Sequence, residues 1–149
     1  MTARRRLAKL RDLQQLQRVE RDIAGLDHAE ACIRADAAQA ASTDAANHAV
    51  LLAGEWYARR GARHFEPELD ILAADGLVRA ERNASAAAMA ARTAEEHRED
   101  TAAAWRLTDA RQRGTQRIVR DCYRAALRAE DEGRLDVTAA RTLERARRG

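Results

Sequence analysis

The stretch RRGARHFEPELD, residues 59–70, divides the chain into two long segments of helix-favouring composition. Pro67 is the only proline among 149 residues, and proline costs about 3 kcal/mol in a helix interior. Two arginines suit the last turn of a first helix, and Gly61 suits the left-handed position that follows it. Pro67 and the acidic residues beside it suit the first turn of a second helix. The sequence therefore predicts a helix over residues 3–60 and a turn over 61–66.

The second predicted helix begins at Pro67 and continues to about residue 131. Gly133 is expected to end it, and Asp136 is expected to cap a short helix over residues 137–147. The two long helices have similar lengths, which favours their pairing. The predicted fold is all-α: a long antiparallel two-helix coiled-coil hairpin with a short C-terminal helix, forming a single domain over residues 1–149.

The composition limits the kind of core that this hairpin can have. The chain contains 36 alanines but only 24 residues of Leu, Ile, Val and Phe, which is 16% of the sequence. A normal globular core is doubtful below about 20%, whereas alanine is the best helix former. Two states fit: an extended coiled coil with a narrow seam, or a helix that folds only on a partner.

Spacing by three and four residues predicts which face of each helix forms the seam. The first helix is expected to use Leu16, Val19, Ile23, Leu26, Glu30, Ile33, Ala37, Ala40, Asp44, Asn47 and Leu51. Leu7, Leu10 and Leu13 extend the apolar pattern on a slightly different phase. The second helix is expected to use Ala87, Ala90, Ala94, His97, Thr101, Ala104, Thr108, Arg111, Thr115, Ile118, Cys122, Ala125 and Ala129.

Charge is distributed unevenly, although the net charge is only +3. Residues 1–11 carry five basic groups and no acid, and residues 101–129 carry seven arginines and two aspartates. Residues 12–58 and 66–100 each carry a net charge of −5. A fold near residue 64 brings the two basic segments together. The end of the hairpin away from the turn, which we call the open end, is therefore expected to be basic. A run at helical spacing predicts a basic partner-binding face, with a solvated face in an arginine-rich chain as the alternative. This run comprises Arg113, Arg117, Arg120, Arg124 and Arg128.

No constellation of residues predicts an enzyme, a cofactor site or a metal site. The four histidines are scattered, and a metal site from His28 and His97 with Asp27 and Glu30 lacks supporting ligand spacing. Cys32 and Cys122 are expected to be free thiols. No apolar run reaches about 18 residues, and no signal peptide follows the basic start, so we expect a cytoplasmic protein without membrane insertion.

Apolar residues near the turn form a second candidate partner-binding site. Leu69 and Leu72 fit one stripe of the second helix, and Ile71 and Val78 fit another. A two-helix seam buries only one stripe, so the other is expected to face outward. Trp56 and Tyr57 are adjacent, so at least one of them should be exposed or should cover the turn. Trp56 is included in this site, and a small local core formed with Phe65 is the alternative.

These segments resemble the YscO/FliJ family, the stalk proteins of type III secretion and flagellar export. The basic start Arg4-Arg5-Arg6-Leu7 leads into Leu10, Leu13 and Val19-Glu20 and then into a long alanine-rich segment. The break near residue 64 is followed by an end that reads Arg124, Leu127-Arg128-Ala129-Glu130-Asp131-Glu132 and Leu135-Asp136.

The resemblance implies a non-enzymatic antiparallel coiled coil that engages the hexameric ring of the secretion ATPase and the export gate protein, and also export chaperones. On this interpretation the basic open end meets the ATPase and the apolar patch after Pro67 meets the gate. Two alternatives stay open: a basic coiled coil that binds nucleic acid, which no recognised motif supports, and a helical adaptor that self-associates.

Overall fold

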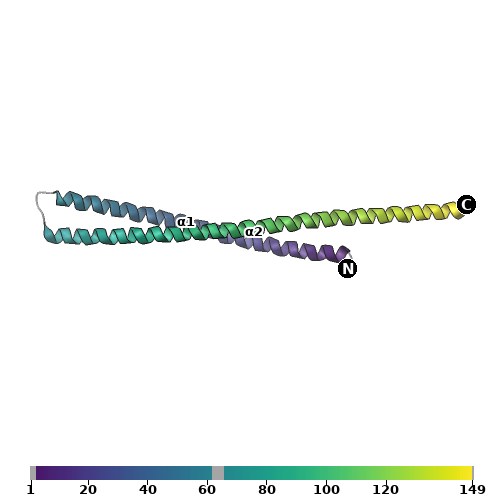
Figure 1. Cartoon of the computed structure of the whole chain (residues 1–149), viewed down its shortest axis with the longest axis horizontal. Helices are drawn as coiled ribbons and strands as arrows, with labels where there is room; N and C mark the ends of the chain where they lie inside the picture. Colours follow the sequence, from purple (N-terminus) through teal and green to yellow (C-terminus); the bar gives the residue numbers. More distant parts are fainter. Residues whose placement is uncertain (1–2, 62–65, 149) are drawn as a thin grey trace. The chain divides into compact units, whose positions relative to one another are not determined.

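The computed structural model describes residues 3–61 and 66–148, and these residues form an all-α helical hairpin. Helix α1 spans Ala3–Arg60 and helix α2 spans Pro67–Arg148. The two helices pack against each other, and they are the two coiled ribbons of Figure 1. The predicted all-α helical hairpin and the limits of the first helix are thus confirmed. Residues 62–65 of the predicted turn, among them Arg63, His64 and Phe65, lie outside the described residues.

The helix ends beside the turn follow from local chemistry. The amide of Asp70 donates to the carbonyl of Glu66 (N–O 3.0 Å), so Pro67 is the first helical residue, where its missing N–H costs nothing. The amide of Gly61 donates to the carbonyl of Tyr57 (3.2 Å), which continues the α-helical hydrogen bonds of α1. No described glycine has a positive φ. The predicted left-handed conformation of Gly61 is therefore wrong.

Helix α2 does not end near residue 131. It continues without interruption through Gly133 and Asp136 to Arg148, so the predicted short separate helix is wrong. A glycine inside a helix costs only about 1 kcal/mol relative to alanine, and the residues around Gly133 favour helix. Without a proline, one glycine is insufficient to end the helix.

The chain divides into two compact units, each of which contains part of both helices. Unit 1 comprises Met1–Ile23 and Arg106–Gly149, and unit 2 comprises Ala24–Trp105. The prediction of a single domain over the whole chain stays a prediction. The two units differ in the chemistry of their helix–helix seams.

The seam of unit 2 is built from alanine. The fully buried apolar residues of the described chain are Ala31, Ala35, Ala49, Ala80 and Ala91, and all five belong to unit 2. On α1 the seam positions follow a three–four alternation and include no aspartate, glutamate, lysine or arginine. They are Ala24, His28, Ala31, Ala35, Ala38, Ser42, Ala45, Ala49, Leu52 and Trp56. Small side chains on both helices let the backbones approach closely, but they bury little area per turn.

The predicted seam of α1 is on the wrong face. All eleven predicted positions are exposed, with Leu26 at 72% and Ile33 at 70%. The observed seam is displaced by two residues, which is about 200° around the helix. Burying the predicted face would desolvate the carboxylates of Glu30 and Asp44 against alanines, at a large cost. Leu7 and Leu10 are half-buried, so their phase matches the observed seam face of α1.

The predicted seam of α2 is partly correct. Six of its positions are buried or half-buried: Ala87, Ala94, Thr101, Thr108, Thr115 and Cys122. The positions predicted between them are exposed, because the packed residues lie one position further along. These packed residues include Ala91, Arg98, Gln112 and Val119.

The seam of unit 1 is polar. Gln112 and Thr115 on α2 are each 8% exposed, and they are the only buried polar residues among those described. Arg21 donates from Nη1 to Oε1 of Gln112 (3.1 Å) across the two helices. Oε1 of Gln17 is buried without a hydrogen-bond partner within the described chain. Among the described residues of unit 1, the fully buried ones are therefore polar, while apolar seam residues such as Leu10 and Val119 are half-buried.

Within the described residues, neither helix contains a segment whose length and hydropathy would let it cross a membrane.

Candidate functional site

The predicted basic face lies on α2 within unit 1. Arg113, Arg117, Arg120, Arg124 and Arg128 are all exposed, and their three–four spacing places them on one side of the helix. We call these five residues the arginine face. Arg113 pairs with Asp109 (2.8 Å) one turn earlier. Within the described chain, no carboxylate pairs with Arg117, Arg120 or Arg124, so their charge is available to a partner.

The arginine face continues into a helical segment that nothing covers. Every residue from 127 to 148 is exposed, so within the described residues no part of α1 packs on this segment of α2. Arg128 donates from Nε to the carbonyl of Arg124 (3.4 Å), and Arg148 pairs with Glu144 (2.6 Å). Both contacts join residues four positions apart on α2, so they are local to this helix.

A polar groove of about 770 Å³ lies between α1 and α2 in unit 1. We call it the unit-1 groove. Its α2 wall comprises Asp109, Gln112, Arg113 and Gln116, and its α1 wall includes Arg11, Gln14, Gln15, Arg18 and Val19. Arg11 belongs to the predicted basic end, but the groove itself was not predicted. The phase of Leu7 and Leu10 continues through Gln14 and Gln17, and this signal could have located it.

Both stripes of the apolar patch after Pro67 are exposed, with Leu69 at 47% and Leu72 at 63%, so the expectation that the seam buries one of them is wrong. Leu69 and Leu72 line a groove of about 260 Å³ together with Leu52, Trp56 and Ala73. The ring of Trp56 lies under the guanidinium of Arg60 (Cζ 4.7 Å from the ring centroid) and contacts Tyr57 at 5.1 Å between ring centroids.

Trp56 is therefore half-buried between the helices, while Tyr57 is exposed, as the adjacency of the two rings required. Oδ1 of Asp70 and Nε1 of Trp56 are buried without hydrogen-bond partners in the described chain. Asp70 approaches Nε of Arg60 through Oδ2, at 4.0 Å. Trp56 thus belongs to a local core around α1 and α2 and does not project as an isolated anchor.

The second stripe, Ile71 and Val78, is exposed to a similar extent. Their exposed fractions are 62% and 43%, and neither residue lines the groove beside Trp56. Seven residues separate them, so they lie on one side of α2, two turns apart. The structure leaves this pair accessible to a partner.

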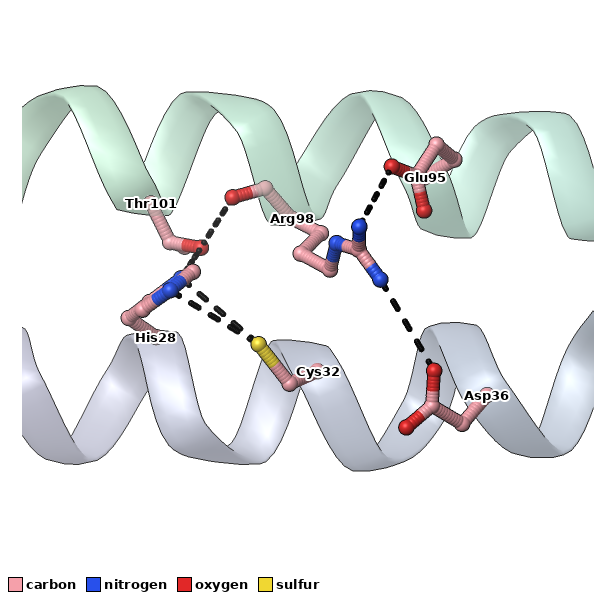
Figure 2. A network of polar contacts seen from close by, with 6 residues as sticks. All are labelled: His28, Cys32, Asp36, Glu95, Arg98 and Thr101. Carbon is pink, nitrogen blue, oxygen red and sulfur yellow. Dashed lines mark hydrogen bonds and ion pairs between the residues drawn. The ribbon is translucent and has the colours of Figure 1, made fainter.

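A polar cluster interrupts the alanine seam in the middle of unit 2 (Figure 2). Figure 2 shows His28, Cys32 and Asp36 on α1 opposite Glu95, Arg98 and Thr101 on α2. Arg98 pairs with Glu95 (3.1 Å) on its own helix and reaches Asp36 (3.7 Å) across the seam. These cross-helix pairs join residues whose numbers rise on α1 and fall on α2, which is the antiparallel register.

His28 makes polar contacts with residues of both helices. Thr101 donates its hydroxyl proton to the carbonyl of Arg98 (3.0 Å), so its oxygen must accept from Nδ1 of His28 (3.3 Å). The thiol of Cys32 lies 3.7 Å from Nε2 of the same ring. A polar layer of this kind fixes the register of a coiled coil.

Trp105 covers the same cluster. Its ring stacks on that of His28 at 5.8 Å between centroids and 15° between planes. Gly25 permits this position, because a Cβ there would lie 3.3 Å from Nε1 of Trp105. No pattern in the sequence predicted this stacking.

His28 and His97 do not pair, because His28 contacts Thr101 and His97 is exposed, which agrees with the lack of ligand spacing in the sequence. Within residues 3–61 and 66–148, no three side chains of His, Cys, Asp or Glu come together in a group that could hold a metal ion. Cys32 and Cys122 are both free thiols, as predicted.

No protein-family model, no curated protein and no solved structure matches this chain.

Proposed function

We propose that this chain is a non-enzymatic coiled-coil stalk component of a type III secretion or flagellar export apparatus, acting in the cytoplasm. The observation that carries the proposal is the arginine face, where Arg117, Arg120 and Arg124 are exposed and lack carboxylate partners within the described residues. The helical hairpin and the resemblance of both chain ends to the YscO/FliJ family agree with it.

The arginine face is the proposed contact with the ring of the export ATPase. Arginine forms strong, directional pairs with carboxylates and is enriched where binding energy concentrates at interfaces. Unpaired arginines at helical spacing match an acidic surface without first having to break internal salt bridges. Arg113 contributes less on this proposal, because Asp109 already holds it.

Ile71 and Val78 are the proposed contact with the export gate protein. Both side chains are exposed, and neither lines the groove beside Trp56 to which Leu69 and Leu72 belong. An apolar pair two turns apart suits a helical groove on a partner. Export chaperones are further candidate partners under the same proposal.

Reversing three charges of the arginine face should weaken binding to the export ATPase by about tenfold or more. The variant carries Arg117→Glu, Arg120→Glu and Arg124→Glu, and each change replaces an attraction with a repulsion. The measurement is titration of the purified full-length chain with the ATPase of the same organism. Circular dichroism checks that the variant keeps its helicity.

The matched control changes the same net charge on exposed residues of α2 in unit 2: Arg79→Glu, Arg82→Glu and Arg92→Glu. It should bind the ATPase within about twofold of the unaltered chain, since single surface charges contribute little. Unchanged binding by the arginine-face variant, or equal losses in both variants, would contradict the proposal.

The gate contact is tested by Ile71→Asp combined with Val78→Asp. Both side chains are exposed, so the helix should persist while secretion of a known export substrate falls several-fold. The control pair Val50→Asp and Met89→Asp alters two other exposed apolar residues of unit 2 and should leave secretion unchanged. Normal secretion by the first pair would exclude this contact.

Two measurements separate the proposal from its alternatives. Binding of random duplex DNA that falls steeply with salt would favour a nucleic-acid-binding coiled coil. Sedimentation of the free chain as an oligomer would favour a self-associating adaptor.

A further inference from the structure

The unit-1 groove has an excess of positive charge that the fold does not neutralise. Four arginines line it, together with two aspartates. Arg21 pairs with Asp22 (2.6 Å), and Arg113 pairs with Asp109 (2.8 Å). Among the described residues, no carboxylate pairs with Arg11 or Arg18. The unneutralised charge of the groove therefore lies on its α1 wall.

The spacing of this charge is defined by the helix that carries it. Arg11 and Arg18 are seven residues apart on α1, which places them on one side of the helix and about 10.5 Å apart along its axis. Any rigid ligand that satisfies both guanidinium groups must present two negative charges at a similar separation. Two acidic residues seven positions apart on another α-helix meet this requirement, because their rise is the same.

The other groove residues suit the flank of such a helix. Gln14 and Gln15 lie between the two arginines on α1, and Gln116 lies across the groove on α2. Their amides can donate to carboxylates and accept from other side chains. Gln112 is already engaged with Arg21 and is 8% exposed, so it forms a fixed part of the floor.

We infer that the unit-1 groove binds an acidic helix of a partner protein, with carboxylates seven residues apart that pair with Arg11 and Arg18. This site shares Arg113 with the arginine face, but its unpaired charge lies on Arg11 and Arg18 of α1, and it does not depend on the function proposed above. Nucleic acid fits the groove less well. A nucleic-acid strand carries a charge about every 3.4 Å along its axis, which would set phosphates against Asp22 and Asp109 as well as against the arginines.

The test uses the full-length chain and a fluorescein-labelled helical peptide of about 28 residues with glutamate at every seventh position. A second peptide carries the same number of glutamates at five-residue intervals, and a third has glutamine in their place. Fluorescence anisotropy measures the affinity of each. We expect the seven-spaced peptide to bind most tightly, because only its carboxylates match the spacing of Arg11 and Arg18 on α1.

The variant Arg11→Gln with Arg18→Gln should bind the seven-spaced peptide about five- to tenfold more weakly, as expected for two lost charge pairs. The matched control is Arg134→Gln with Arg141→Gln, an exposed pair with the same seven-residue spacing outside the groove. It should bind the peptide within about twofold of the unaltered chain.

Three results would overturn the inference. The first is equal affinity of the seven-spaced and five-spaced peptides. The second is an equal loss of affinity in the groove variant and the control variant. The third is tighter binding of duplex DNA than of any peptide, with a loss of DNA affinity in the groove variant, which would assign the groove to nucleic acid.

Discussion

Replacing Ala35 with leucine is expected to destabilise the protein by about 1–3 kcal/mol. Ala35 is buried in the seam of unit 2, where α1 packs against an alanine face of α2. A leucine there adds three heavy atoms between two closely spaced backbones, and the helices must separate or the side chain must adopt a strained rotamer. Unfolding by urea, followed by circular dichroism, measures the change.

The control is Ala40→Leu, an equally large substitution on the face of α1 that the sequence pattern had favoured. Ala40 is exposed, so its replacement should change the free energy of unfolding by less than about 0.5 kcal/mol. If Ala40→Leu destabilised the protein more than Ala35→Leu, the seam of α1 would have to lie on the face that carries Leu26 and Ile33.

Replacing Gln17 with leucine is expected to stabilise the protein by about 1–2 kcal/mol. Oε1 of Gln17 is buried without a hydrogen-bond partner within the described residues, and an unsatisfied buried polar group costs about 1–3 kcal/mol. Leucine has a similar length, removes that cost and adds apolar burial. Amide hydrogen exchange measures the change, and exchange should become slower in the α1 and α2 segments of unit 1.

Gln15→Leu provides the comparison within the same unit. Gln15 is exposed, so leucine there removes no buried polar atom and should leave the free energy of unfolding nearly unchanged. A loss of stability in the Gln17→Leu variant would mean that the glutamine amide makes a favourable contact in solution.

Proline and alanine content made the fold predictable, because both act locally. Pro67 cannot occupy a helix interior, and the alanine-rich segments on either side favour helix, so the start of α2 followed directly. Gly133 misled the prediction for the same local reason. Glycine lowers helix propensity modestly, and the strength of the surrounding helix decides the outcome.

The face that α1 presents to α2 depends on the partner helix and was therefore harder to predict. The stripe through Leu16, Ile23 and Leu26 looked like a seam because it carries the larger aliphatic residues. An alanine face on α2 selects small, uncharged neighbours instead, and the charged Glu30 and Asp44 exclude the alternative. This selection requires both helices to be considered together.

The candidate sites also differ in whether one helix or both helices form them. The arginine face and the outward pair Ile71 and Val78 are patterns on one helix, so their spacing in the sequence located them. The unit-1 groove and the cluster around His28 combine side chains from both helices. Their positions depend on the register between Arg21 and Gln112 or between His28 and Thr101, which no single segment specifies.

The alanine seam of unit 2 also bears on how the protein responds to temperature and denaturant. The heat-capacity change of unfolding and the dependence on urea both scale with the surface that unfolding exposes. A seam whose fully buried residues are alanines contributes little such surface. The heat-capacity change of unfolding should therefore fall below the value of about 12–15 cal/mol/K per residue that is usual for globular proteins. Stability should vary gradually across temperature, with a broad melting transition.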